Sequence, residues 1–325
     1  MTAETAWGFP DHLRPQAEAL SFDLQPALDA MLSVRAEVPE DAFTAASLGT
    51  ERIGNGIAIG TDGLVLTIGY LITEASAVWL TTNQGQVCEA HPLAYDQASG
   101  LGLLLPLQRL SIPTLSIGSA TALQVDRPVS VISHGGQAHA LQARVVSCRT
   151  FAGYWEYVLE RAIYTAPAHP QWGGSALLDE AGQLVGVGSL LVEEARAEGQ
   201  KQQGNLFVPI DLLTPIYDAL LKTGRRPGPP RPWLGLYAAP TDGALVVGAL
   251  AEGGPAQRAG LRVGDLLLEI ADQRVTDMAA FWHALWSLGP AGVSVPLTVA
   301  RHGRRLHIRV ESMDREDILK KPRLH

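Results

Sequence analysis

Hydrophobic and polar positions alternate over short distances along most of the chain. Between residues 45 and 223, short apolar runs are separated by Gly, Pro, Asn and Asp at intervals of roughly ten residues, which is typical of an all-β domain. Because no helical pattern lies between these runs, β-barrels or sandwiches are favoured over a parallel α/β sheet. Strands are expected at residues 57–60, 64–67, 78–82, 101–105, 125–133 and 143–148.

The flanking segments have different patterns. Residues 1–43 resemble a leader, with a short helix expected over residues 24–34 that runs into the first strand. A second helix is expected to end near Lys222, before a Pro-rich linker at residues 224–231 that should be exposed and semi-rigid. Residues 232–311 have the size of one small domain. The charged tail, residues 312–325, is expected to fray.

One helix in the last third has a clear amphipathic period. Thr276 and Asp277 are placed to cap it, and Gly289-Pro290 ends it. Its apolar positions follow the i, i+3, i+4, i+7 spacing, so part of this stripe should be core. The positions are Met278, Phe281, Trp282, Leu285, Trp286 and Leu288.

Composition and charge mainly exclude some classes of partner and site. Hydrophobic residues make up 46% of the 325 residues and charged residues 18%, which suits a packed globular core. The net charge is −8 without a basic stripe, so nucleic acid is not an expected partner. Cys88 and Cys148 can pair, but two free buried thiols are favoured. His91, His134 and His139 lack metal-ligand spacing and are interpreted as loop or surface residues, so no metal or cofactor is expected.

The N-terminal residues contain neither a basic region nor an apolar segment typical of a signal peptide. The apolar runs are also shorter than the ~18 residues that cross a bilayer. These features predict a cytoplasmic protein without a membrane span, or a periplasmic one if the chain has been trimmed.

A glycine-rich loop followed by two apolar strands carries the first family resemblance. The sequence from 168 to 179 is Ala-His-Pro-Gln-Trp-Gly-Gly-Ser-Ala-Leu-Leu-Asp, and a Gly182 turn leads to Val185-Gly186-Val187. It resembles the nucleophile loop of the HtrA/Do family of chymotrypsin-like serine proteases, N-P-G-N-S-G-G-P-L-L-N. In this alignment the nucleophilic serine position is Gly173.

The other two triad positions depart from the family in the same way. The family's G-S-G, P-D-G and T-N-N-H-V-V segments align with residues 54–56, 61–63 and 67–72, which places Tyr70 at the histidine position. The D-x-x-T-D-L-A-L-L segment aligns with residues 96–104 and places Gly100 at the aspartate position. The resemblance implies a mainly β fold: two six-stranded chymotrypsin-like β-barrels at residues 44–223, followed by a small α+β PDZ domain.

These replacements predict a loss of acyl transfer. A serine nucleophile needs a hydroxyl, a base beside it and a carboxylate that orients the base. Glycine has no nucleophile, and tyrosine, with a pKa of about 10, is a poor base at neutral pH. A rearranged pair of Ser175 and His169 is one alternative, with Asp96 as a displaced carboxylate. More ordinary roles are favoured: Ser175 bonds the loop backbone, His169 replaces a turn asparagine and Asp96 is an exposed turn residue.

In the family the oxyanion hole is formed by backbone N–H groups, which do not depend on the triad side chains. Gln171, Trp172 and Gly173 can therefore still hold a carbonyl or carboxylate oxygen. For the Trp172 side chain itself, packing in the cleft is favoured over contact with a ligand.

The most specific resemblance lies in residues 252–270, which match the S-P-A-x-x-A-G-L-x-x-G-D-x-I-x-x-I segment of HtrA-type PDZ domains. The resemblance implies a groove between a helix and a strand edge, with a loop whose N–H groups hold a peptide's C-terminal carboxylate. A module used only for packing or assembly is the alternative. The implied peptide-binding residues are Trp233, Leu234, Gly235, Leu236, Phe281 and Leu285.

Together these features predict a catalytically inactive HtrA-like protein that binds peptides, unfolded segments or protein C-termini as an adaptor, regulator or chaperone-like protein. Two alternatives remain: a serine endopeptidase with a non-standard nucleophile, and a scaffold subunit of an HtrA-like assembly. The resemblance also implies a homo-oligomer, a trimer in the family.

Overall fold

The computed structural model describes residues 7–60, 63–196, 201–241 and 243–321. Thr61 and Asp62 of the predicted turn lie outside the described residues. So do residues 1–6 of the predicted leader and residues 322–325 of the predicted tail. The chain divides into two compact units. The barrel unit comprises the chain up to Arg149, residues 161–226 and the end from Lys320. The C-terminal unit comprises residues 150–160 and 227–319.

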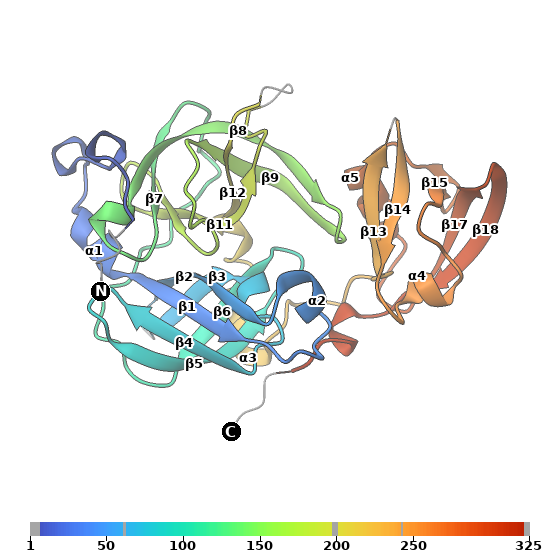
Figure 1. The fold of residues 1–325 in the computed structure, drawn as a ribbon, viewed down its shortest axis with the longest axis horizontal. Coiled ribbons are helices and arrows are strands. Elements are labelled where there is room, and N and C mark those ends of the chain that lie inside the picture. Colours follow the sequence, from blue (N-terminus) through green and yellow to red (C-terminus); the bar gives the residue numbers. More distant parts are fainter. Residues whose placement is uncertain (1–6, 61–62, 197–200, 242, 322–325) are drawn as a thin grey trace, which may run out of the picture. The chain divides into compact units, whose positions relative to one another are not determined.

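The first half of the barrel unit is a closed barrel with strand order β1-β2-β3-β6-β5-β4 (Figure 1). Alternate residues of its first strand, Leu32, Val34 and Ala36, are buried, as a strand with one face on a core requires. The same strand pairs with β2 on one side and β4 on the other, which closes the barrel. The strands are β1 (Met31–Glu37), β2 (Glu51–Ile59), β3 (Leu64–Ile68), β4 (Ala77–Thr82), β5 (Val87–Tyr95) and β6 (Leu101–Pro106).

A second closed barrel follows, in the order β10-β11-β12-β9-β8-β7. Its core includes Val131, Leu141, Leu177 and Phe207, all fully shielded from solvent. The predicted mainly β fold with two six-stranded barrels is thereby confirmed. The strands are β7 (Pro128–Ile132), β8 (Leu141–Gly153), β9 (Tyr157–Ala166), β10 (Ala176–Leu178), β11 (Leu184–Val192) and β12 (Gly204–Pro209).

The C-terminal unit is built on a sheet of order β13-β14-β15-β17-β18, with β16 paired to β15. Helix α5 packs Phe281, Trp282 and Leu285 into its core, and the Asp277 side chain accepts the Ala280 N–H as the predicted cap. The elements are β13 (Leu236–Thr241), β14 (Ala244–Leu250), α4 (Pro255–Arg258), β15 (Leu266–Ile270), β16 (Gln273–Arg274), α5 (Met278–Ser287), β17 (Ser294–Arg301) and β18 (Arg304–Glu311).

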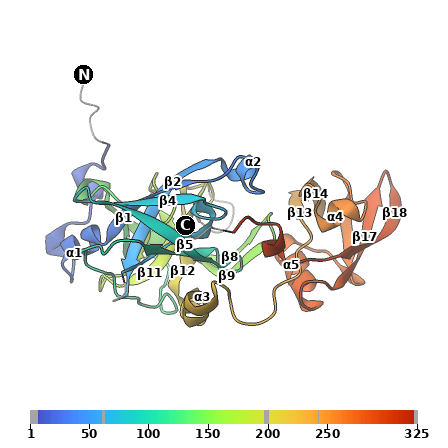
Figure 2. The ribbon, with the colours of Figure 1, turned by 90° about the horizontal axis from the view of Figure 1, so that it is seen from below.

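Short helices complete the described chain (Figure 2). The α-helices outside the C-terminal unit are α1 (Leu24–Asp29), α2 (Ala45–Leu48) and α3 (Tyr217–Thr223). Single 3-10 turns are η1 (Asp11–Leu13), η2 (Ala17–Ala19), η3 (Gly69–Leu71), η4 (Gln137–His139), η5 (Ile210–Leu212) and η6 (Arg315–Asp317).

The leader predicted for residues 1–43 is more than a leader. The helix expected within residues 24–34 ends at Asp29, and β1 begins two residues later as an integral barrel strand. The helix was expected to continue into residues 31–34, which instead belong to β1. Burial alternates along Met31–Glu37 because one face of this strand must cover the barrel interior, and this alternation identifies a strand.

The linker and the tail are better fixed than expected. Arg226 in the linker makes two hydrogen bonds to the Asp96 carboxylate, at 2.9 and 3.0 Å. In the tail, Met313 exchanges both backbone hydrogen bonds with Trp233, at 3.0 and 3.1 Å. The Lys320 N–H donates to Glu74 at 2.9 Å. Met313 and Lys320 thus attach the tail at two points, and the expectation of a frayed tail is wrong for this part of it.

Strands β8 and β9 run out of the second barrel as a long hairpin (Figure 1). Its tip, residues 150–160, belongs to the C-terminal unit. The core of that unit includes Val158, and Ala152 packs against it. The sequence did not predict this association.

Candidate functional site

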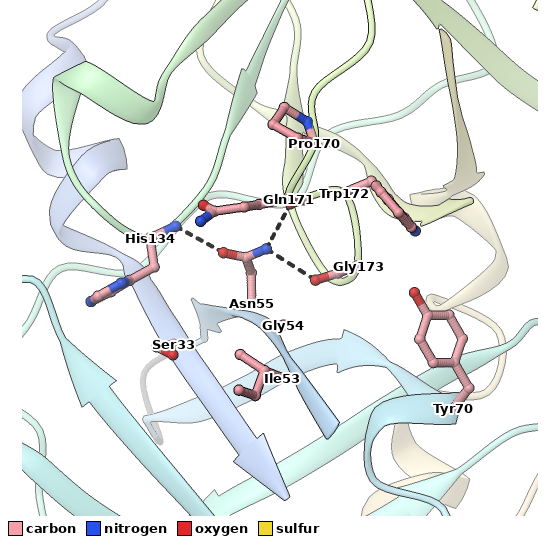
Figure 3. Close-up of a pocket in the computed structure, with 10 residues that line it drawn as sticks. All are labelled: Ser33, Ile53, Gly54, Asn55, Tyr70, His134, Pro170, Gln171, Trp172 and Gly173. Carbon is pink, nitrogen blue, oxygen red and sulfur yellow. Dashed lines mark hydrogen bonds between the residues drawn. The ribbon is translucent and has the colours of Figure 1, made fainter. Parts of the chain in front are cut away.

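The glycine-rich loop at residues 168–175 borders a cavity of about 340 Å³ in the barrel unit (Figure 3). Strand β1, strand β2 and turn η3 supply the opposite walls. The lining residues are Ser33, Ile53, Gly54, Asn55, Tyr70, His134, Pro170, Gln171, Trp172 and Gly173.

Asn55 of β2 fixes the loop against the first barrel (Figure 3). Its side-chain N–H group donates to the carbonyls of Gln171, at 2.9 Å, and Gly173, at 3.0 Å. Its side-chain oxygen accepts the His134 N–H at 2.9 Å. The Asn55 side chain is 3% exposed, so these bonds form away from water, where an amide must be paired. One buried side chain thus holds two loops in place.

The serine position of the resemblance, Gly173, lies against the histidine position, Tyr70. A Cβ atom on Gly173 would stand 2.8 Å from the Tyr70 hydroxyl, closer than side-chain atoms normally approach. That hydroxyl donates to the Ser189 carbonyl at 3.0 Å. Burial raises the pKa of Tyr70, although a side-chain hydrogen bond with Trp172 lowers it. The tyrosine is therefore a neutral hydrogen-bond donor in the space that a serine side chain would need.

The aspartate position, Gly100, is part of a tight turn. Its φ of +79° is a left-handed conformation that favours glycine over aspartate. The Gly100 N–H donates to the Asp96 carbonyl at 2.7 Å, and the Gly100 carbonyl accepts the Gly69 N–H at 2.7 Å. The turn thus joins Gly100 to the residue before Tyr70 through the backbone alone.

Asp96 is not the exposed turn residue that was expected. It is buried, and its carboxylate accepts from the Ser99 N–H and hydroxyl as well as from Arg226. Burial raises the pKa of Asp96, but the hydrogen bonds from Arg226 and Ser99 lower it more, so the net shift is downward. In a displaced triad this carboxylate would accept a hydrogen bond from a histidine. Here Arg226 and Ser99 donate to it instead.

Ser175 and His169 are both buried, and each is bonded to backbone. The Ser175 hydroxyl donates to the Trp172 carbonyl at 2.8 Å. The His169 ring bonds the His139 carbonyl through Nε2 at 2.8 Å and accepts the Gln171 N–H through Nδ1 at 3.0 Å. Burial lowers the pKa of His169 to about 4, so the ring is neutral at pH 7. Trp7 and Phe9 pack edge-on against the same ring.

One N–H group of the oxyanion loop, residues 171–173, is used within the chain. The Gln171 N–H, which an open oxyanion hole would offer to a substrate, donates to His169 instead. Trp172 lines the cavity and shares a hydrogen bond with Tyr70, so its side chain is part of the cavity wall. The loop is arranged to satisfy its own groups.

The loop at residues 234–236, hereafter the carboxylate loop, is the one that the resemblance implies for a peptide's C-terminus. In this structure its N–H groups have an acceptor from the hairpin tip, residues 150–160. Glu156 Oε1 accepts the N–H groups of Leu234 at 3.1 Å, Gly235 at 2.8 Å and Leu236 at 3.2 Å. Of the other residues predicted to bind peptides, Trp233 is 6% exposed, and Phe281 and Leu285 are core residues, 1% and 0% exposed. The backbone N–H groups of this loop therefore share one acceptor, whereas the side chains of Trp233, Phe281 and Leu285 are buried.

Sequence reasoning missed Asn55 and Glu156. Asn55 stands between two glycines on a buried strand, which is an unusual place for a polar residue and a usable signal. Glu156 lies in the run Tyr154-Trp155-Glu156-Tyr157, an acid among aromatic residues at a strand-to-strand turn. Among the residues described, no group of three or more His, Cys, Asp and Glu side chains is arranged to hold a metal, and Cys88 and Cys148 are free thiols.

Two family models match the chain in the order that the fold displays. The trypsin-like peptidase domain matches residues 54–187, and the PDZ domain matches residues 246–301. The first match covers the loop and all residues that line the cavity except Ser33 and Ile53. The second covers most of the C-terminal unit's sheet.

Curated relatives are named as probable periplasmic serine endoproteases that are DegP-like. The protein from Halomonas elongata is 26% identical over 287 residues, 82% of this chain and 57% of the relative. The protein from Chlamydia muridarum is 27% identical over 271 residues, 79% of this chain and 53% of the relative. The chain thus spans about half the length of the curated relatives it matches.

The expectation of a cytoplasmic protein is contradicted by these relatives, because their names place them in the periplasm. The expectation depended only on the N-terminal residues of the given sequence and not on the folded domains that these relatives share. No helix within the described ranges is long and apolar enough to cross a membrane.

Solved structures agree on the fold. An HtrA-type protease, AlgW, with a decapeptide gives a TM-score of 0.53 at 18% identity, covering 92% of this chain and 98% of the other. The serine endoprotease from Yersinia pestis gives a TM-score of 0.54 at 19% identity, covering 89% and 96%. With a trypsin-like peptidase domain followed by a PDZ domain, the chain belongs to the HtrA-like family.

Proposed function

We propose that this HtrA-like protein is catalytically inactive and binds peptide segments, protein C-termini included, through its PDZ domain. The observation that carries the proposal is the replacement at the nucleophile position. Gly173 has no side chain, and the Tyr70 hydroxyl stands where one would be. Without a nucleophile the acyl-enzyme route is closed, and what remains of the family's machinery is recognition.

The neighbouring hydroxyl and imidazole support the loss of activity. Ser175 is fully buried and donates to a carbonyl, and His169 uses both ring nitrogens on the backbone. A general base must reach the proton it removes, directly or through one water, and these bonds direct the two groups elsewhere. A serine endopeptidase using Ser175 would require the loop to rearrange.

The carboxylate loop supports the binding role. Three consecutive N–H groups converge on one oxygen, which is the geometry that captures a peptide's terminal carboxylate. This chemistry uses only backbone, so it does not depend on the lost triad. The names of the periplasmic relatives favour the periplasm as the compartment in which such peptides are met.

Unfolded casein tests the catalytic part of the proposal. We expect the purified chain to leave casein intact, and a Ser175→Ala variant to behave identically, because the serine hydroxyl is held by the Trp172 carbonyl. The measurement is the release of acid-soluble fragments over hours. Cleavage by the parent chain that disappears in Ser175→Ala would establish a non-standard serine peptidase instead.

Peptides with a free C-terminus test the binding part. A fluorescein-labelled pool of random decapeptides should bind the chain more tightly than the same pool with amidated C-termini, because amidation removes the charge that the loop N–H groups attract. Fluorescence anisotropy measures both. Equal binding of the two pools would contradict recognition through the carboxylate loop.

The packing of Tyr70 on Gly173 predicts that serine cannot simply be restored. Gly173→Ser should lower the free energy of unfolding by about 1–3 kcal/mol, because its Cβ would overlap the Tyr70 hydroxyl. In a Tyr70→His background, which shortens the side chain, the same substitution should cost less. Urea unfolding of the four proteins gives the coupling energy, expected at about 0.5 kcal/mol or more. Additive effects would show that the two positions are not packed against each other.

A further inference from the structure

The tip of the β8–β9 hairpin, residues 150–160, contacts each part of the PDZ domain that bounds a peptide groove. At the loop, both Glu156 oxygens lie within 3.2 Å of the Leu234 N–H, and Oε1 also accepts from Gly235 and Leu236. An incoming peptide carboxylate would need the same three donors. Each backbone N–H is a single donor, so the two carboxyl groups compete for the loop.

The strand edge and the helix are engaged as well. β13 is the edge strand of the sheet, and the Ala238 N–H donates to the Tyr154 carbonyl at 3.2 Å. From α5, the Trp282 indole donates to the Gly153 carbonyl at 3.0 Å. These bonds use the tip's backbone, as strand addition to a sheet edge does. His283 of α5 also lies 3.2 Å from the Glu160 carboxylate.

The backbone of the tip is shaped for this contact. Glu156 has a φ of 60°, a left-handed conformation that is uncommon for residues other than glycine. Such a conformation persists where surrounding contacts determine it. Glu156 is 6% exposed although its neighbour Tyr154 is 57% exposed, so the acid has been directed inward at the end of an otherwise accessible turn.

We propose that the hairpin tip is the chain's own ligand for the PDZ groove, and that a peptide C-terminus binds by displacing Glu156 from the carboxylate loop. This rests on the proposed function, because it regulates the same site. Docking of the tip lowers the fraction of protein that is competent to bind, and the apparent affinity for peptide falls by that fraction.

Protonation adjusts the docking. Burial raises the pKa of Glu156 to about 8, while the N–H groups of Leu236, Leu234 and Gly235 and the charge of Arg315 in η6 lower it. Tyr237 of β13 and Tyr154 of the tip also face this cluster. A released glutamate titrates near 4.5, so docking takes up a proton. Docking is then strongest below about pH 4.5, where the released glutamate is also protonated, and it weakens as the pH rises through about 8.

Hydrogen exchange of the intact protein tests the docking itself. In Glu156→Ala, the amides of Leu234, Gly235 and Leu236 should exchange at least about tenfold faster, because they lose their acceptor. The control is Glu40→Ala, which removes an exposed acid of the barrel unit that takes no part in the docking. Amides of the β15–β17 ladder serve as the folding control and should be unchanged. Unaltered exchange at residues 234–236 in a folded Glu156→Ala protein would overturn the proposal.

Peptide binding then separates this proposal from the proposed function. The decapeptide pool with free C-termini should bind Glu156→Ala at least about tenfold more tightly than it binds the parent or Glu40→Ala. If exchange accelerates but neither the free nor the amidated pool binds, the tip docks as described and the peptide-binding function fails. If the pool binds the parent and Glu156→Ala equally, the tip does not compete and the proposal is wrong.

The same pool measures the pH dependence. Its affinity for the parent chain should rise between about pH 5 and pH 8, because the tip is released while the peptide carboxylate stays ionised. Glu156→Gln keeps an oxygen acceptor but cannot titrate, so its affinity should be nearly constant over this range. An identical pH profile in both proteins would exclude Glu156 as the titrating group.

Discussion

Three backbone N–H groups, of Leu234, Gly235 and Leu236, converge on one point, and buried donors need an acceptor. This requirement explains much of the C-terminal unit. It accounts for the burial of an acid at a hairpin turn and for the inclusion of residues 150–160 in a unit otherwise made of residues 227–319. In the proposed function a peptide carboxylate meets the same requirement and takes the place of Glu156.

The barrel unit meets its own requirements differently. Its nucleophile loop keeps a defined backbone because Asn55 holds the carbonyls of Gln171 and Gly173. At the positions that align with the family's histidine and serine, Tyr70 lies against Gly173 and its hydroxyl donates to a backbone carbonyl. The proposed loss of acyl transfer is therefore compatible with an intact fold, since backbone bonding and core packing are independent of the triad.

Much of this arrangement could be predicted from the sequence. Short alternating strands indicate barrels, and the cap at Asp277 with its apolar stripe indicates α5, because both depend on local periodicity. Strand β5 was missed because Pro92 lies within it and proline weakens a strand pattern. β1 was taken for leader because its alternation follows directly on a helix.

The candidate sites were less predictable. Contacts such as those of Asn55 with Gln171 or Glu156 with Gly235 join residues far apart in sequence, and no local pattern encodes them. The burial of Asp96 depends on Arg226, which lies in what composition alone indicates is an exposed, semi-rigid linker. Family resemblance gave the positions of Tyr70, Gly100 and Gly173 but not what surrounds them.

A fluorophosphonate reagent followed by intact-mass measurement tests the loss of the nucleophile most directly, because it reacts with an activated serine irrespective of substrate preference. The chain is predicted to show its unmodified mass after prolonged exposure, since Ser175 is buried and bonded to the Trp172 carbonyl. A stoichiometric adduct on Ser175, or on another serine of the barrel unit, would contradict the account and show that the acyl-transfer chemistry has moved within the site.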